Sequence, residues 1–323
     1  MLLTSKGKSN TSTAQELITS SMNTLVQALE AGHSEALAAY LAAMGRFHTY
    51  SFSNIFLIAT QKPSATRVAG IRTWNQLGRR VKKGEKGILI FAPLVGWKRK
   101  PETEESKPKK RGKKNQAENA AQAPEVERVQ YLLGFRGVYV WDVAQTEGDE
   151  LPTLTNTVQG DVTQALPRLI EFVESQQIKL EFSDKISPAR GMSYGGMIRI
   201  LPDMQPTETL ATLVHELGHE MLHRAERRTL TTKTVRETEA EAVAFVVCHA
   251  LGLETGTGSA DYIQLYHGDA KLLQESLEVV QRTASIILGA ISPRDEAAPM
   301  IAAVPTIPAA VIENTTPQVQ EVQ

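Results

Sequence analysis

The chain has 323 residues, of which 41% are hydrophobic and 22% are charged. This length predicts roughly two domains of ordinary size, and the composition supplies enough apolar side chains for packed cores. No apolar run approaches the roughly 18 residues that cross a bilayer, and no apolar signal segment follows Lys6 and Lys8. The single cysteine, Cys248, lies in an apolar run, so we expect a buried thiol rather than a nucleophile. These features predict a soluble cytoplasmic protein with no membrane partner.

The two halves of the chain carry opposite charge. Residues 1–144 hold 22 Lys and Arg against 11 Asp and Glu, whereas residues 145–323 hold 13 against 25. A basic half favours an anionic partner such as nucleic acid, and an acidic half does not. The asymmetry therefore indicates two domains with different partners.

The amino-terminal half begins with helical patterns. Apolar residues recur at helical spacing from Thr13 onward, Gly32 interrupts them, and Ser34 can cap a second helix. A short apolar segment that ends at Pro63 predicts a third helix. The elements expected here are two helices within 13–45, a helix at 52–61, a helical turn at 73–77 and a strand at 88–94.

Residues 98–128 interrupt this pattern. They are rich in Lys, Glu, Pro, Ala and Gln and contain almost no large apolar residue, so we expect a disordered insertion in a long hairpin loop. Strands resume at 130–135 and 137–142, and one of them is expected to pair with 88–94. Residues 145–160 are expected to form a polar linker.

An amphipathic helix opens the second half at 162–176, with Leu166, Leu169 and Val173 on one face. A strand and a Gly-rich hairpin follow it, and then several helices. The elements expected after 176 are strands at 179–182 and 198–201, helices at 207–224, 237–251, 260–266 and 269–291, and a disordered tail at 294–323.

The helix expected at 207–224 carries the motif His215-Glu216-Leu217-Gly218-His219. Histidines four residues apart lie on one face of a helix, so both imidazoles can reach one metal ion. Glu216 lies beside them, placed to hold a water molecule at the metal, take its proton and deliver it to a leaving amine. Histidines of an apolar helix often only pack, but here a carboxylate-rich helix follows. The motif therefore predicts a zinc peptidase centre.

A third ligand has to come from elsewhere. The metzincin spacing would place a histidine at position 225, which is Ala225, so that class is excluded. Glu237 and Glu241 share one face of the following helix, whereas Glu239 points elsewhere. We assign Glu237 as the ligand and Glu241 as the carboxylate that orients a ligand histidine, and the reverse assignment remains open. We expect His223 to be a surface or hydrogen-bonding histidine.

The segment from Arg67 to Lys114 is strongly basic, with 16 Lys and Arg and only 4 acidic residues. Cationic side chains among exposed aromatic rings suit a non-specific single-strand binder, because phosphates provide affinity and bases stack on rings. Alternatively, Trp74 belongs to the core and the lysine run is a solvated turn. The candidate DNA-binding residues are Tyr50, Phe52, Arg67, Arg72, Trp74, Arg79, Arg80, Lys82, Lys83 and Lys86.

Segments of both halves carry a family resemblance: 50–54, 69–74 and 78–88 in the first half, and 215–219, 237–253 and 260–262 in the second. Together they resemble the ArdC-type antirestriction proteins, over nearly the whole chain except 98–128 and the tail. The resemblance implies a single-strand DNA-binding domain joined to a zincin-like metallopeptidase domain, and protection of incoming plasmid DNA from host restriction during conjugation. The glutamates of the second half also resemble those of peptidases that cleave phage-type repressors, which supports Glu237 as the ligand.

We therefore expect an α+β protein with a single-stranded DNA-binding domain at 1–144, a linker at 145–160 and a zincin-like metallopeptidase domain at 161–293. The expected cofactor is one Zn²⁺ per chain, with another divalent metal as the alternative. The expected partners are single-stranded DNA and a peptide or protein substrate that the sequence does not identify. Two rival functions remain: a DNA-coating protein with a vestigial metal site, and a regulatory metallopeptidase that cleaves one protein partner.

Overall fold

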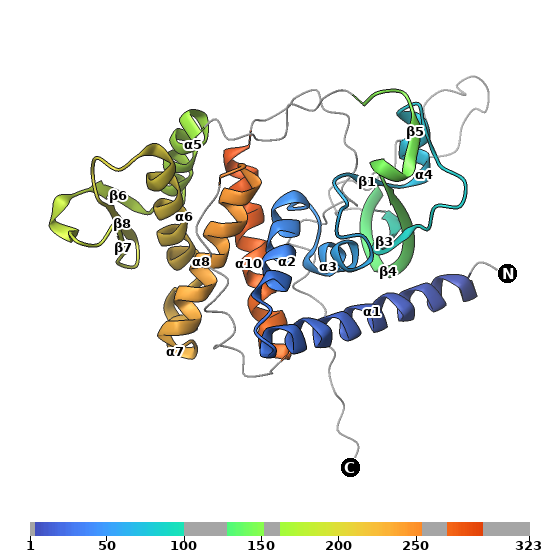
Figure 1. Cartoon of the computed structure of the whole chain (residues 1–323), viewed down its shortest axis with the longest axis horizontal. Coiled ribbons are helices and arrows are strands. Elements are labelled where there is room, and N and C mark those ends of the chain that lie inside the picture. Colours follow the sequence, from blue (N-terminus) through green and yellow to red (C-terminus); the bar gives the residue numbers. More distant parts are fainter. Residues whose placement is uncertain (1–3, 100–127, 152–161, 254–269, 293–323) are drawn as a thin grey trace, which may run out of the picture. The chain divides into compact units, whose positions relative to one another are not determined.

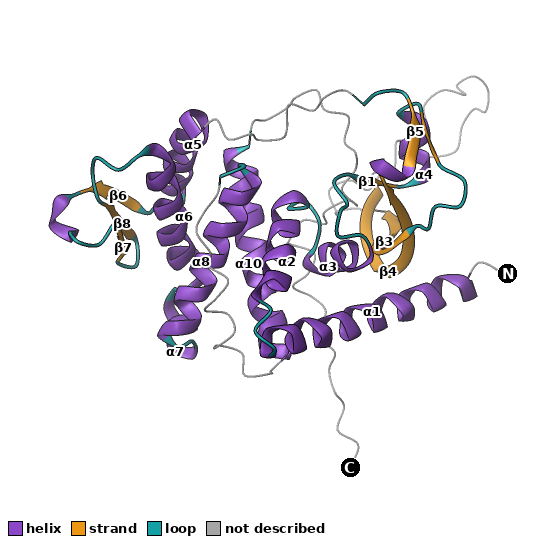
Figure 2. Cartoon of the chain, viewed as in Figure 1, coloured by secondary structure: helices purple, strands orange, loops and turns teal. Residues whose placement is uncertain are grey.

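The computed structural model describes residues 4–99, 128–151, 162–253 and 270–292 (Figure 1). Helices and strands are mixed, so the expected α+β class is confirmed (Figure 2). One compact unit contains the described chain up to Phe91 and from Gly137 onward, and a second contains the described parts of Ala92–Arg136. In these ranges, no helix combines the length and the apolar character that a membrane span requires. The helix expected at 260–266, the tail at 294–323 and most of the insertion at 98–128 lie outside the described residues.

The chain begins with three helices, α1 (Thr4–Glu30), α2 (Ser34–Arg46) and α3 (Phe52–Gln61). Gly32, with φ at +86°, separates the first two, as the sequence predicts. Helix α1 begins nine residues before the expected start at Thr13, because its first turns carry no apolar periodicity that would reveal them. The apolar faces of the three helices are buried together.

A group of strands follows these helices: β1 (Val68–Ala69), β2 (Arg79–Val81), β3 (Ile88–Arg99), β4 (Arg128–Asp142) and β5 (Thr146–Gly148), with the short helix α4 (Ile71–Gln76) after β1. Strand β4 lies between β1 and β3, and β2 pairs antiparallel with β5. Two strands were expected at 130–135 and 137–142, but β4 runs through both. The buried Asp142 at its end accepts hydrogen bonds from the backbone of Thr66 and Arg67.

The second half contains a small sheet and six described helical elements. Strand β8 pairs parallel with β6 and antiparallel with β7, so β7 is an edge strand. The short helix α7, which the sequence pattern did not reveal, lies between the two helices of the metal motif. The bounds are α5 (Val162–Ser175), β6 (Lys179–Phe182), η3 (Asp184–Ile186), β7 (Gly191–Ser193), β8 (Met197–Ile200), α6 (Pro206–Leu222), α7 (Ala225–Leu230), α8 (Lys233–Ala250) and α10 (Ala270–Ile291).

Helix α8 is central to the packing, because it contacts α6, α10 and α2 (Figure 1). Glycines allow the closest approaches. A Cβ on Gly218 of α6 would lie 3.3 Å from the Cα of Ala240, and one on Gly45 of α2 would lie 2.9 Å from the carbonyl oxygen of Val246. Helix α8 therefore packs against α2, which precedes the expected linker at 145–160, and against α6 and α10, which follow it.

Candidate metal centre

Three side chains of α6 and α8 converge on one point. The Nε2 atoms of His215 and His219 are 3.2 Å apart. The Oε2 atom of Glu237 lies 3.6 Å from His215 Nε2 and 3.4 Å from His219 Nε2. The close crossing of α6 and α8 at Gly218 brings the carboxylate opposite the two imidazoles.

These spacings fit a metal ion. Ligand atoms about 2.0–2.1 Å from a tetrahedral zinc lie roughly 3.3 Å from one another. The three observed separations cluster around that value, and nitrogen and carboxylate oxygen are donors that a divalent transition metal accepts. The residues predicted as ligands thus form a triad that could hold a divalent metal.

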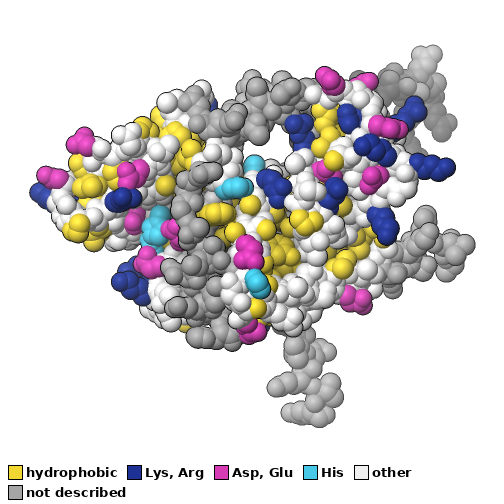
Figure 3. All heavy atoms as spheres, in the orientation of Figure 1, with side chains coloured by type: hydrophobic (Ala, Val, Ile, Leu, Met, Phe, Trp, Pro, Cys, Tyr) yellow, Lys and Arg dark blue, Asp and Glu magenta, His cyan; other side chains and the backbone are white. Residues whose placement is uncertain are grey.

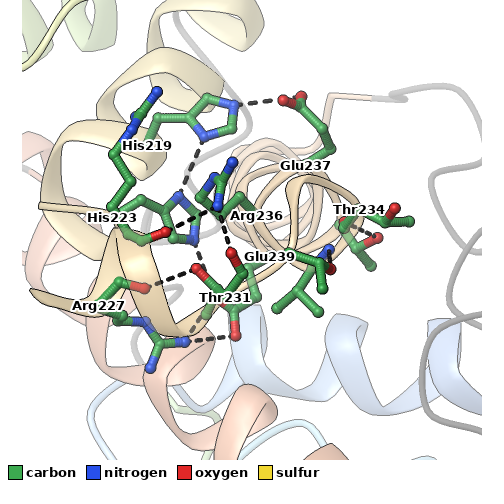
Figure 4. A network of polar contacts seen from close by, with 12 residues as sticks. His219, His223, Arg227, Thr231, Thr234, Arg236, Glu237 and Glu239 are labelled. Carbon is green, nitrogen blue, oxygen red and sulfur yellow. Dashed lines mark hydrogen bonds and ion pairs between the residues drawn. The ribbon is translucent and has the colours of Figure 1, made fainter.

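Both histidines have a polar partner on the ring nitrogen that faces away from the triad. His215 Nδ1 lies 3.3 Å from Oε2 of Glu241, the carboxylate that the sequence predicts to orient a ligand histidine. His219 Nδ1 lies 3.2 Å from Nδ1 of His223 (Figure 4). Both imidazoles therefore present Nε2 to the same point.

The charge state of the triad without metal follows from its contacts. Burial disfavours the charged imidazolium of His215, but the carboxylates of Glu237 and Glu241 outweigh it and raise the pKa of His215 to about 9. The same contact with His215 lowers the pKa of Glu237 to about 2. Burial and the charge on His215 lower the pKa of His219 to about 4. Binding a metal at neutral pH must therefore displace a proton from His215.

Glu216 lies next to the triad and is buried. Burial raises the pKa of Glu216 to about 7, which suits a general base that works near neutral pH. Its side chain packs against β7, where a Cβ on Gly191 would lie 2.7 Å from its Cγ. Helix α6 and the edge strand are in contact here.

A cleft of about 630 Å³ opens beside the triad. Its walls come from the beginning of α6, the edge strand β7 and the middle of α8. The lining residues include Gly191, His215, Glu216 and Glu241. An extended chain can enter such a cleft beside an unpaired strand edge.

Two family models match the chain. Residues 12–131 match the N-terminal domain of anti-restriction factor ArdC, and residues 175–284 match the IrrE N-terminal-like domain of peptidase family M78. The chain therefore carries an ArdC-type N-terminal domain followed by an IrrE-like domain. The metal triad lies within the segment that matches the IrrE-like domain. The match to this peptidase family indicates a metallopeptidase fold for that segment.

Individual proteins match the chain at low sequence identity. A protein of Bacillus anthracis without an assigned function is 27% identical over 276 residues, which cover 77% of this chain and 46% of that protein. The chain thus spans about half the length of that relative. The metal-free crystal structure of the antirestriction protein ArdC from plasmid R388 is 17% identical, with a TM-score of 0.42, covering 75% of this chain and 85% of that one. Its Mn(II)-bound structure is 18% identical, with a TM-score of 0.43, covering 78% and 98%.

The candidate DNA-binding residues of the ArdC domain divide into exposed cations and buried rings. Trp74 is fully buried and donates a hydrogen bond to the carbonyl of Trp141, and Phe52 is also buried, so neither offers a face for stacking. Tyr50 is half-buried, and its hydroxyl donates to the carbonyl of Val68. The expectation of exposed stacking rings is therefore wrong for Phe52 and Trp74, and the alternative that Trp74 belongs to the core is the one observed.

The basic candidates lie around α4, β2 and the loop that follows it, and Lys and Arg side chains gather over this region (Figure 3). Arg79 and Lys82 reach backbone carbonyls, Arg79 at Thr146 and Asp149 and Lys82 at Ala144. Arg67 is half-exposed. The exposed cations among the candidates are Arg72, Arg80, Lys82, Lys83 and Lys86.

An exposed ring that the sequence analysis did not select lies beside this loop. Tyr139 of β4 is 46% exposed, and its Cβ lies 2.9 Å from where a Cβ on Gly87 would be. Alternate residues of a strand share a face, so Tyr139 and the half-buried Trp141 lie on one face of β4. Two aromatic residues at alternate positions of a predicted strand, Tyr139 and Trp141, with Gly87 in a neighbouring segment, are the sequence signal that could have identified this exposed ring.

Proposed function

We propose that this chain is a zinc-dependent peptidase whose metal is held by His215, His219 and Glu237. The observation that carries the proposal is the spacing of the three ligand atoms, 3.2 to 3.6 Å, next to a buried glutamate in an open cleft. A purely structural metal site has no use for such a glutamate, because it needs no general base.

The bound metal would supply a Lewis acid that activates water and polarises the peptide carbonyl. Glu216 takes the proton of the attacking water and delivers it to the departing amine, which a pKa of about 7 permits in both directions. The backbone of β7 at Gly191 is placed to pair with an extended substrate along the edge of the sheet. Glu241 holds the ring of His215.

A protease assay on the full chain tests this proposal. We expect Glu216→Gln to retain about one metal ion per chain and to lose peptide cleavage, whereas His215→Ala loses both. Metal content is measured by elemental analysis of the purified proteins. Full metal retention in His215→Ala, or full cleavage by Glu216→Gln, would contradict the assignment.

We further propose that the ArdC domain, with a boundary within 145–160, binds single-stranded DNA and that the protein protects incoming plasmid DNA from restriction. Three lysines support this: Lys62, Lys83 and Lys86 line a pocket of about 690 Å³ at the exposed loop. The domain match to an anti-restriction factor points to the same role.

Protection assays with Glu216→Gln separate this function from its rivals. If protection from restriction requires Glu216, proteolysis and DNA binding act together. If protection persists without Glu216, the protein acts by coating DNA. If single-stranded DNA only changes the rate of cleavage, a regulatory peptidase is favoured.

A further inference from the structure

His223 and Glu239 form a buried pair behind the metal triad (Figure 4). His223 Nδ1 lies 3.2 Å from Nδ1 of His219, and His223 Nε2 lies 2.9 Å from Oε2 of Glu239. The side chains of His223 and Glu239 are 0% and 1% exposed. A titratable pair this deeply buried, in contact with a metal ligand, has no explanation in the reaction described above.

A third side chain holds Glu239. Arg227 of α7 lies 2.6 and 2.7 Å from its two carboxylate oxygens. This guanidinium balances the buried charge, so Glu239 is present as a carboxylate that only accepts hydrogen bonds. Glu239 points away from the metal triad, as its position on the helix predicts, but it reaches the site through His223.

The direction of each hydrogen bond follows from that carboxylate. Because Glu239 only accepts, His223 Nε2 must carry a proton. A neutral imidazole then has no proton on Nδ1, so His223 Nδ1 accepts from Nδ1 of His219. His219 consequently keeps its proton on Nδ1 and presents the lone pair of Nε2 toward Glu237 and His215.

We propose that His223 and Glu239 are positioning residues that hold His219 in the tautomer and orientation that bind the metal. This inference rests on the metal site proposed above. The two ligand histidines then have different hydrogen-bond partners. His215 contacts the partly exposed Glu241. His219 contacts the buried His223, which is linked through the buried Glu239 to Arg227.

Metal affinity of the full-length protein tests the pair. His223→Leu removes the acceptor for His219 Nδ1, and we expect it to weaken zinc binding roughly 10–100-fold in competition with a chromophoric chelator. His223→Asn places an amide oxygen near the position of Nδ1, so we expect it to recover part of this loss. The absorption spectrum of the cobalt-loaded protein should change in His223→Leu and less in His223→Asn.

A matched control separates positioning from packing. Glu220 is equally buried on α6, but its carboxylate accepts from Ser193 and from the backbone of Gly195 and Gly196, and not from a ligand. Glu220→Gln should lower the melting temperature of the metal-free protein and leave zinc affinity unchanged. Glu239→Gln should weaken zinc binding and provides a second variant if His223→Leu does not fold.

The zinc affinities of these variants decide whether His223 and Glu239 position His219. Wild-type zinc affinity in His223→Leu and Glu239→Gln, with only a lower melting temperature, would overturn the positioning role and leave the metal site intact. Equal losses in His223→Leu and His223→Asn would also overturn it, because the acceptor would then be irrelevant. A wild-type chain that binds no zinc would refute the proposed function itself.

Discussion

At the scale of single residues, the carboxylates of α8 have separate tasks. Glu237 and Glu241 lie one turn apart on the side facing α6. Glu237 contacts the Nε2 atoms of both imidazoles, whereas Glu241 contacts Nδ1 of His215. Glu239 lies on the opposite, buried side. Burial alone would raise the pKa of Glu239, but hydrogen bonds from His223 and Arg227 outweigh it and hold that pKa below its ordinary value.

The ligand assignment leads to a direct comparison. We expect Glu237→Gln to remove most bound metal, and Glu241→Gln to weaken affinity only roughly 10–100-fold, because the second carboxylate acts through His215. Chelator competition measures both variants under the same conditions. If Glu241→Gln loses the metal while Glu237→Gln keeps it, the two roles are exchanged.

At the scale of elements, the contact between β7 and α6 determines where the side chain of Glu216 lies. A Cβ on Gly191 would lie 2.6 Å from Cγ2 of Thr212 and 2.8 Å from Oε1 of Glu216. Thr212 is β-branched and cannot move far, so Glu216 or the strand must shift. Gly191 therefore lets the edge strand approach Glu216.

We expect Gly191→Ala to lower peptide cleavage on the order of 10²-fold, the effect of displacing a catalytic group by about 1 Å, while metal content stays at the wild-type level. Initial rates and elemental analysis of the same samples provide the measurement. Gly289→Ala is the matched control, because nothing lies within 4 Å of a Cβ at that position. Unchanged cleavage in Gly191→Ala would show that the strand moves instead of Glu216.

At the scale of the whole molecule, helices of the two matched domains belong to one packed unit. Gln281 of α10 donates to the backbone carbonyl of Tyr50, and Ser285 donates to that of His48. Helix α2 also packs directly on the helix that carries Glu237. DNA binding is therefore best tested on the full chain.

We expect Tyr139→Ala to weaken single-stranded DNA binding by about 1–3 kcal/mol without changing its salt dependence, because it removes a stacking ring. Replacing Lys83 and Lys86 by Ala should instead reduce the salt slope, by roughly 0.7 for each phosphate that is no longer neutralised. Fluorescence anisotropy at several salt concentrations measures both. Phe182→Ala, a similarly exposed ring of β6, is the control and should bind as wild type does. Binding by Tyr139→Ala that equals wild type would exclude stacking at this position.

The sequence by itself determined what is local along the chain. The motif at 215–219 places two histidines on one face of a helix at any tertiary position. An apolar segment that ends before Pro63 located α3, and amphipathic spacing located α5. The tertiary structure decided what depends on distant partners. Trp74 is in the core, where its indole donates to the carbonyl of Trp141 in β4, and Tyr139 is exposed because the strand turns it outward beside Gly87. Glu239 serves the metal site because α7 and the end of α6 bring Arg227 and His223 to it. Spacing within one helix cannot reveal such contacts, since burial and hydrogen-bond partners are properties of packed elements.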